Sequence, residues 1–362
     1  PKDVDIEVYG MPYSDLYDLL KNYLDSQVEL YGNQIPKKEN GETLYKGHVS
    51  FVGQQFGVVK YYDYFGNQYD FSIPRRENKS GVRHTDFDVE PDPTMTPKDA
   101  ANRRDFTWNS LAYDPLTEEL HDYFGGRQDI ENKIIRHTSG AFSEDPLRVL
   151  RGMQFASRFG FDLAPETAEL AKQIADSFEF GYLTPEDIVD KHFGVQTPVD
   201  GIDAPGLSVE LVKDLYPSLS RERIAEEWMK WATKSKHPSK ILSYLKDTGW
   251  DRFFPELAAL RGVEQDPQWH PEGDAESHTA HTVDAALEIA DREGLEGDDR
   301  AAFMLAALLH DIAKPPTTKL REKNGVSRWT SYGHEKQGGP MAEQFLKNIG
   351  IKPDIIDQVK AL

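Results

Sequence analysis

The chain has 362 residues, and its 62 acidic and 42 basic side chains give a net charge of −20. At roughly 150 residues per domain this length predicts two or three domains, and the 38% of apolar residues is enough to bury their cores. The lack of cysteine excludes disulfides, thiolate nucleophiles and cysteine zinc sites, and no apolar run is long enough to span a bilayer, so we expect no membrane anchor.

The first third of the chain predicts a mixed α/β unit. Apolar and acidic residues alternate over residues 1–9, which is typical of a strand, and leucines recur at helical spacing near 13–25. Two further strands are predicted over 56–62 and 68–73, joined by a Gly-Asn turn. The segment 75–97 is rich in charge, Gly and Pro, and we expect a mobile loop there.

Most of the chain after residue 98 has a helical period. Ser143, followed by Glu-Asp-Pro, predicts the start of a helix. The Pro-rich stretch 184–217 predicts an irregular insertion, after which helices are expected over 221–234 and 239–247. A Pro- and Gly-rich linker over 267–273 then opens a last helical unit.

The net negative charge would repel a nucleic-acid backbone from most of the surface. Binding of nucleic acid would therefore need a local basic patch. One candidate is a 32-residue window with these arginines: Arg127, Arg136, Arg148, Arg151 and Arg158.

Three carboxylates fall on predicted strands. Asp3 and Asp5 stand at positions i and i+2 of the first strand, so their side chains share a face, and Asp70 lies on a later strand. Such a set can hold divalent cations for nucleotidyl transfer. Alone, the pattern is a weak signal, because most sequences with Asp-x-Asp carry it as solvated acids on the outer face of an edge strand.

Four ordered segments carry a resemblance to a known family: Asp3-Val4-Asp5, Tyr69-Asp70-Phe71-Ser72-Ile73-Pro74-Arg75, Arg103-Arg104-Asp105-Phe106-Thr107-Trp108-Asn109 and Glu144-Asp145-Pro146-Leu147-Arg148. The chain resembles the class II tRNA nucleotidyltransferase and poly(A) polymerase family, within the polymerase-β-like nucleotidyltransferases. The resemblance implies an α+β fold, in which a small head with a mixed sheet is followed by a mostly helical neck and body.

By this resemblance the domains are a nucleotidyltransferase head over 1–112, a neck and body over 113–265, and a final unit over 266–362. The Gly-Gly segment that grips the triphosphate in the family would precede Pro1, so we expect the head to lack its first residues.

The resemblance also assigns roles. Asp3, Asp5 and Asp70 would be catalytic, with Mg²⁺ held by Asp3 and Asp5, while an RNA 3′-hydroxyl attacks the α-phosphate of a nucleotide and pyrophosphate leaves. The residues that would bind the nucleotide are Arg103, Arg104, Asp105, Asn109, Asp145, Arg148 and Arg151.

Asp145 and Arg148 are expected to share a helix face. A carboxylate and a guanidinium together match the amine and the neighbouring acceptor that cytosine and adenine present, and they disfavour uracil and guanine. An ordinary surface ion pair is the alternative interpretation.

The last unit contains a spaced set of metal-binding residue types, namely His278, His310, Asp311 and His334. With the segments around them they resemble the HD phosphohydrolase domain fused to some bacterial tRNA nucleotidyltransferases. This implies hydrolysis of phosphomonoesters or 2′,3′-cyclic phosphates with a divalent metal, either Mg, Mn, Ni or Co. The later Asp ligand of that family is not evident before Leu362, so we expect the chain to stop within the domain. We expect His281, His237 and His192 to be structural or exposed to solvent.

The leading hypothesis is a cytoplasmic enzyme that adds C, C and A to the tRNA 3′ end from CTP and ATP. Its rivals are a poly(A) polymerase, an enzyme that adds only CC or only A, an HD hydrolase with a defunct transferase site, and a non-catalytic RNA-binding protein. The oligomeric state is left open.

Overall fold

The computed structural model describes residues 4–52, 58–79, 87–177, 219–323 and 325–362. It divides into two compact units, residues 1–103 and 104–362, and each is described by itself. Asp3 and the predicted insertion over 184–217 lie outside the described residues.

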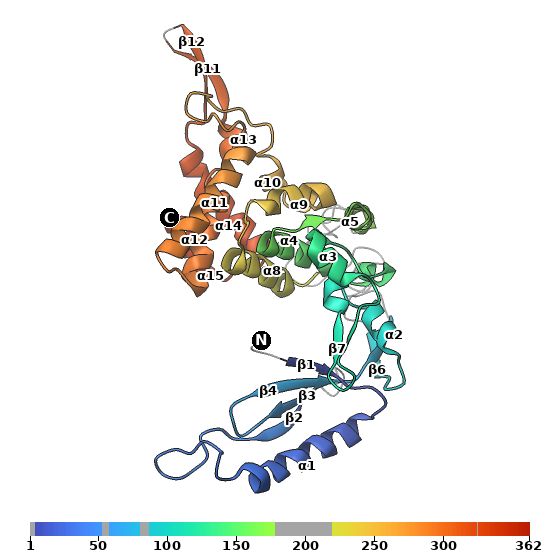
Figure 1. The fold of residues 1–362 in the computed structure, drawn as a ribbon. Coiled ribbons are helices and arrows are strands. Elements are labelled where there is room, and N and C mark those ends of the chain that lie inside the picture. Colours follow the sequence, from blue (N-terminus) through green and yellow to red (C-terminus); the bar gives the residue numbers. More distant parts are fainter. Residues whose placement is uncertain (1–3, 53–57, 80–86, 178–218, 324) are drawn as a thin grey trace, which may run out of the picture. The chain divides into compact units, whose positions relative to one another are not determined.

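Unit 1 is built on a four-stranded mixed sheet (Figure 1). Its strands, in spatial order, are β1 (Val4–Glu7), β4 (Gln68–Ser72), β3 (Val58–Tyr62) and β2 (His48–Val52). β1 runs parallel to β4, whereas the other neighbours are antiparallel. The three predicted strands are confirmed within the described residues, and β2 was not predicted.

Helix α1 (Tyr13–Tyr31) covers one face of this sheet. Leu16, Leu20 and Leu24 form its buried stripe, and they pack in one cluster with Val59 and Tyr61 of β3. Side chains alternate between the two faces of a strand. On β3, Lys60 lies between the buried residues Val59 and Tyr61. Its side chain therefore points to the face of the sheet that α1 leaves uncovered.

The prediction of a loop over 75–97 is wrong at both ends of that segment. β5 (Arg75–Lys79) pairs antiparallel with β6 (Phe87–Pro91), and α2 (Pro97–Asn102) follows, capped by the Thr96 hydroxyl. The two strands are held by backbone hydrogen bonds, which polar sequences can form without any alternating apolar pattern. The alternating apolar pattern by which a sequence predicts strands was therefore absent from β5.

Unit 2 is mainly helical (Figure 1). Its first part contains η1 (Thr107–Ser110), β7 (Ala112–Asp114), β8 (Glu119–His121), α3 (Gly126–Asn132), β9 (Ile134–Ile135), η2 (Gly140–Glu144), α4 (Leu147–Phe159), β10 (Asp162–Leu163) and α5 (Pro165–Ser177). The middle contains α8 (Arg221–Lys234), α9 (Lys240–Thr248), η3 (Trp250–Phe253) and α10 (Pro255–Ala258). The last part contains α11 (Ala275–Arg292), α12 (Gly297–Leu309), α13 (Lys314–Thr317), β11 (Lys319–Lys323), β12 (Val326–Thr330), α14 (His334–Asn348) and α15 (Pro353–Ala361).

The helices predicted after the insertion are confirmed as α8 and α9. The predicted helix start at Ser143 is wrong, because α4 begins at Leu147 with Pro146 as its N-cap. The Ser143 hydroxyl instead donates to the carbonyl of Gly140 within the preceding 3₁₀ turn. Among the helices of the described residues, none is long and apolar enough to cross a membrane.

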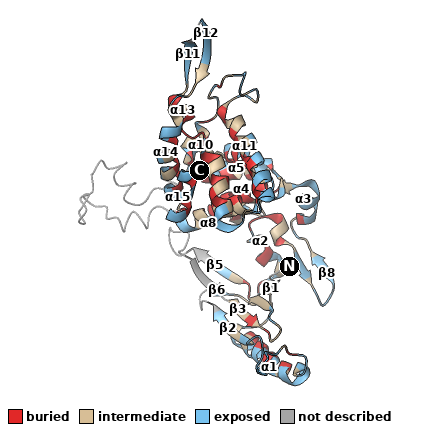
Figure 2. Ribbon diagram, turned by 90° about the vertical axis from the view of Figure 1, so that its left-hand side faces the viewer, coloured by how far each residue is buried: buried red, intermediate tan, exposed pale blue. Residues whose placement is uncertain are grey.

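One hydrophobic core joins the early and late helices of unit 2 (Figure 2). Its centre is Trp228 of α8, which is fully buried. The Trp228 ring lies edge-on to Phe254 at 5.0 Å and to Phe345 of α14 at 5.5 Å between centroids. Helices from both halves of the unit therefore share a single packed interior.

Gly152 allows α4 and α9 to pack at close range. A Cβ atom at this position would lie 2.1 Å from the Tyr244 hydroxyl oxygen and 3.2 Å from the Phe106 ring. Any larger residue would have to push α4 away from α9, because interiors packed at this density leave no room for an added methyl group.

Replacing Trp228 with Ala should lower the free energy of unfolding of unit 2 by about 3–5 kcal/mol, because it opens a large cavity at the shared core. Urea unfolding followed by near-ultraviolet circular dichroism would measure the loss. Trp269, whose side chain is 71% exposed, offers a matched control, since Trp269→Ala should change stability by less than about 0.5 kcal/mol. Equal effects of the two substitutions would contradict a shared core centred on Trp228.

Candidate functional sites

The uncovered face of the unit 1 sheet brings two of the predicted carboxylates together. Asp5 of β1 and Asp70 of β4 are direct partners in the parallel register, so their side chains project from the same face. Asp5 is exposed, whereas Asp70 contacts Lys60 Nζ at 3.2 Å and accepts a hydrogen bond from Gln68 Nε2 at 3.1 Å. Asp3, the third predicted carboxylate, is not among the described residues.

This donor set fits a hard divalent cation such as Mg²⁺. Carboxylate oxygens are the protein ligands that Mg²⁺ prefers, and an exposed strand face leaves room for the water and phosphate oxygens that it also needs. Glu7, which follows Asp5 by two residues and accepts a hydrogen bond from the Tyr9 hydroxyl at 2.6 Å, adds further negative charge to this face. The sequence alternation alone could have identified Glu7.

In unit 2, the buried carboxylate of Asp105 connects two other predicted residues. It accepts hydrogen bonds from Asn109 Nδ2 at 2.9 Å and from Arg151 Nε at 2.7 Å, and from the Phe106 amide at 2.9 Å. Asp105 therefore orients the start of η1 and a side chain of α4 at the same time. The three residues form a polar cluster in which the Arg151 side chain remains 34% exposed.

Asp145 lies just before α4 and not within it. Its backbone is extended, with φ −129° and ψ 100°, so the expected shared helix face with Arg148 is wrong. Arg223 of α8 holds the Asp145 carboxylate through both guanidinium nitrogens, at 2.6 and 3.3 Å. Arg148 donates to the carbonyl of Ala141 at 2.6 Å. Arg223 was missed because it is 78 residues away in sequence.

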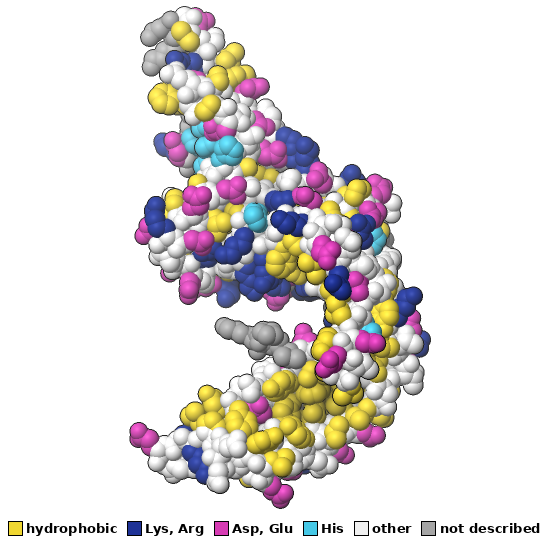
Figure 3. Space-filling model, viewed as in Figure 1, with side chains coloured by type: hydrophobic (Ala, Val, Ile, Leu, Met, Phe, Trp, Pro, Cys, Tyr) yellow, Lys and Arg dark blue, Asp and Glu magenta, His cyan; other side chains and the backbone are white. Residues whose placement is uncertain are grey.

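The two adjacent arginines of the predicted motif fall on either side of the boundary between the units. Arg103 ends unit 1 and donates to the carbonyl of Arg75 at 3.2 Å, whereas Arg104 begins unit 2 and is exposed. Basic side chains of unit 2 gather over the region where Figure 1 draws α4 and α8 (Figure 3). Of the predicted arginine window, Arg148, Arg151 and Arg158 belong to α4, whereas Arg136 is paired with Asp129 at 3.1 Å.

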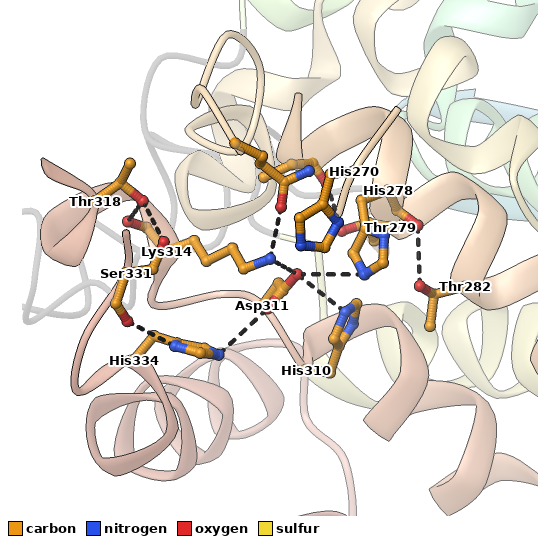
Figure 4. A network of polar contacts seen from close by, with 12 residues as sticks. His270, His278, Thr279, Thr282, His310, Asp311, Lys314, Thr318, Ser331 and His334 are labelled. Atoms are coloured by element: carbon orange, nitrogen blue, oxygen red, sulfur yellow. Dashed lines mark hydrogen bonds and ion pairs between the residues drawn. The ribbon is translucent and has the colours of Figure 1, made fainter. Parts of the chain in front are cut away.

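All four residues of the predicted His and Asp set converge in the last part of unit 2 (Figure 4). The buried carboxylate of Asp311 lies 3.0 Å from His310 Nε2, 3.7 Å from His278 Nε2 and 3.6 Å from His334 Nε2. α11 supplies His278, the end of α12 supplies His310 and Asp311, and the first turn of α14 supplies His334. As expected, His281 and His237 are exposed, whereas His192 lies outside the described residues.

A buried lysine also contacts this cluster. Lys314 Nζ lies 2.7 Å from Asp311 Oδ2 and donates to Gln265 Oε1 at 2.6 Å. Burial alone would raise the pKa of Asp311, but the close contacts with His310 and Lys314 lower it to about 2. The carboxylate is therefore ionised at neutral pH, as a metal ligand must be.

Glu272 and His270 complete the outer side of the cluster, and the predicted ligand set did not include them. Glu272 Oε1 lies 2.7 Å from His278 Nδ1 and 3.0 Å from His270 Nδ1. Its own amide and these two imidazoles lower the pKa of Glu272 to about 2. The ionised carboxylate favours a proton on His278 Nδ1. Nε2 of that ring, on the side of Asp311, then carries a lone pair that can bind a metal ion.

The arrangement fits a divalent metal ion. His278, His310 and Asp311 each offer one ligand atom within 4.8 Å of the others. Within the described part of the chain, no hydrogen bond of ordinary geometry reaches Asp311 Oδ2, although Lys314 Nζ lies 2.7 Å from this atom. Imidazole nitrogen combined with carboxylate oxygen suits several transition metals, so the donor set alone does not select one.

Comparison with known proteins relates both regions to described families. Residues 2–136 match the poly A polymerase head domain, and residues 276–362 match the HD domain. The chain is 34% identical over 269 residues to the multifunctional CCA protein of Xanthomonas campestris pv. campestris (strain B100), covering 71% of this chain and 55% of that protein. It is 33% identical over 293 residues to the multifunctional CCA protein of Vibrio parahaemolyticus serotype O3:K6, covering 80% of this chain and 58% of that protein.

The chain therefore spans a little over half the length of these curated relatives. Among solved structures, a tRNA-processing enzyme in an apo form matches with a TM-score of 0.52 and 18% identity, over 99% of this chain and 68% of that one. A CCA-adding enzyme in complex with CTP matches with a TM-score of 0.51 and 16% identity, over 99% of this chain and 61% of that one. These likenesses concern the fold.

Both domain families use divalent metal ions, in agreement with the two donor sets described above. The paired strand carboxylates, the motif around Asp105 and the histidine cluster all fall in regions that the comparisons match or cover. The chain belongs to the tRNA nucleotidyltransferase and poly(A) polymerase family and carries an HD domain at residues 276–362.

Proposed function

We propose that this protein adds C, C and A to the 3′ end of tRNA from CTP and ATP, releasing pyrophosphate, in the cytoplasm. The observation that carries the proposal is the register of β1 and β4, which sets Asp5 directly beside Asp70 on an open sheet face. A solvated edge strand has no need for two carboxylates in register, because like charges on neighbouring strands repel each other. The multifunctional CCA proteins to which the chain is similar support the same activity.

Asp5 and Asp70, with Asp3, would hold Mg²⁺ at this face. When bound, the metal supplies charge neutralisation on the reacting phosphate and lowers the pKa of the attacking hydroxyl. The contribution of the protein is to hold the carboxylates on a rigid sheet. Lys60, which contacts Asp70 at 3.2 Å, adds a positive charge for a phosphate oxygen and keeps Asp70 oriented.

Base selection is assigned to Asp145, Arg148 and the supporting cluster. A carboxylate has about four acceptor positions, and the Arg223 guanidinium and the Leu147 amide use only some of them. The remaining positions can accept the exocyclic amine of cytosine or adenine, while Arg148 donates to the neighbouring acceptor of the base. Arg151, oriented by Asp105, would contact phosphate or sugar.

A second activity, hydrolysis of phosphate esters, is proposed for the HD domain because its histidine cluster surrounds an ionised, buried Asp311. His278, His310, Asp311 and His334 would hold the divalent metal, which supplies a polarised phosphate and an activated water when bound. Lys314, which contacts both Asp311 and Gln265, would neutralise a bound phosphate oxygen.

The decisive experiment incubates the protein with Mg²⁺ and a tRNA that ends at the base before the CCA sequence. CTP and ATP are supplied separately and together, and the 3′ ends are then sequenced. We expect two C residues followed by one A, with synthesis stopping there. Unlimited A tails would instead assign a poly(A) polymerase, and addition of only C or only A would assign a partial enzyme.

Replacing Asp5 with Asn should lower the rate of nucleotide addition by at least about 10³-fold, because the isosteric amide cannot neutralise a metal ion. Hydrolysis of p-nitrophenyl phosphate by the HD domain should be unaffected. Asp18→Asn, at an exposed position of α1, is the matched control in the same unit. Full addition activity in Asp5→Asn would exclude this face as the transferase site.

Replacing Arg223 with Gln should relax base selection, because Asp145 loses the partner that fixes its orientation. We expect the ratio of kcat/KM for CTP to that for UTP to fall by about tenfold. Single-nucleotide addition assays with each triphosphate would measure it. An unchanged ratio together with normal overall activity would show that Asp145 does not select the base.

Replacing Glu272 with Ala should weaken metal binding at the HD site about 10- to 100-fold, because His278 loses the carboxylate that fixes its tautomer. Calorimetric titration with Mn²⁺, carried out in an Asp5→Asn background to silence the head, would measure the affinity. Nitrogen NMR of the histidine rings should also show His278 losing its Nδ1 proton preference. Glu288→Ala, at an exposed position of α11, should change neither.

A further inference from the structure

The hairpin of β11 and β12 starts and ends at the HD cluster. At its first end, the Thr318 hydroxyl donates to the backbone carbonyl of Lys314. The side chain of the same lysine contacts Asp311 through Nζ. At its other end, the carbonyl of Ser331 lies 2.7 Å from His334 Nδ1. Thr318 and Ser331 join the two ends through their hydroxyls at 2.8 Å, as Figure 4 shows. Both stems of the hairpin are thus tied to residues of the proposed metal site.

One face of this hairpin is cationic. Lys319 and Arg321 are two residues apart on β11, so their side chains share a face, and Arg328 is the direct partner of Arg321 across the ladder. All three are exposed. From residue 319 to residue 334 the chain holds four basic residues and one acidic residue, although the protein as a whole has a net charge of −20.

Arg321 and Arg328 repel each other when the hairpin is alone. Like charges directly opposite on neighbouring strands are unfavourable, and here each arginine has a different weak partner. Arg321 lies over the Tyr332 ring at 5.1 Å, and Arg328 contacts Asp266 at 3.3 Å with its side chain 45% exposed. Exposed contacts of this kind contribute little to stability. An anion that bridges the two guanidinium groups can therefore take the place of the contacts with Tyr332 and Asp266.

Tyr332 adds an aromatic surface at the base of the same hairpin. Its side chain is 67% exposed, and it precedes His334 by two residues. A solvent-exposed ring below an arginine is the combination on which unpaired bases stack. The largest group of histidine side chains visible in Figure 3 lies close to the part of unit 2 where Figure 1 draws the hairpin.

We infer that this hairpin is a binding surface for single-stranded RNA that delivers a phosphate-bearing RNA end to the HD site. Arg321 and Arg328 contact backbone phosphates upstream of the end, and Tyr332 stacks on a base. Charge favours RNA as the partner here, because the described residues of this face offer three exposed cations, Lys319, Arg321 and Arg328, next to the exposed ring of Tyr332. The inference deepens the hydrolase part of the proposed function and rests on it.

The test uses the full chain and a fluorescent six-nucleotide RNA that ends in a 2′,3′-cyclic phosphate. Binding is measured by anisotropy at several salt concentrations, in wild type and in the double variant Arg321→Gln/Arg328→Gln. We expect about tenfold weaker binding. The slope of log affinity against log salt should flatten by about 1.4, since each phosphate contact with a single strand contributes about 0.7. Tyr332→Ala should also weaken binding about tenfold, without a change in the salt slope.

Arg292→Gln/Lys352→Gln is the matched control, because it removes two cations from exposed positions of the same domain. Hydrolysis of p-nitrophenyl phosphate, which is too small to reach the hairpin, should be unchanged in all variants. Equal affinity and equal salt slope in wild type and the hairpin variant would overturn the inference. If wild type hydrolyses neither substrate, the hydrolase part of the proposed function fails, while the binding comparison still decides whether the hairpin holds RNA.

Discussion

The packing of Trp228 against Phe254 and Phe345 is the interaction on which the geometry of unit 2 depends. Trp228 belongs to the helix that also supplies Arg223, and Phe345 belongs to the helix that begins at His334. A single buried ring therefore connects the helix that orients Asp145 with the helix that carries His334 of the histidine cluster. Because interiors are packed as tightly as organic crystals, neither helix can shift without disturbing the other.

The carboxylate face shows what a sequence pattern can predict. Alternation of apolar and acidic residues predicted β1, and two β-rich stretches joined by a Gly-Asn turn predicted β3 and β4. The face that carries Asp5 follows directly from the period of two. The pairing of Asp5 with Asp70 did not follow, because it depends on which strands are neighbours and in what register. The sequence thus indicated the right residues and their faces, whereas the fold alone determined their proximity.

Other features had no local signal. The pairing of β5 with β6 depends on backbone hydrogen bonds between strands with mostly polar residues, so no hydrophobic period announced it. Asp145 has an extended backbone because the 3₁₀ turn before it ends there, and the Glu-Asp-Pro pattern that suggested a helix start fits both conformations. Arg223 and Glu272 became visible only through contacts that link distant or irregular segments. For the histidine cluster, in contrast, the residue types together with the resemblance of the surrounding segments to the HD domain predicted four of the residues that converge.

The close approach at Gly152 restricts how the proposed base selection can change during evolution. α4 carries both Arg148 and Arg151, and the contact with Tyr244 fixes the position of that helix along α9. A lineage that retains this glycine cannot accommodate a larger or smaller base by sliding α4. New specificities must instead arise from exchanges of individual side chains at the ends of the helix, with the backbone kept in place.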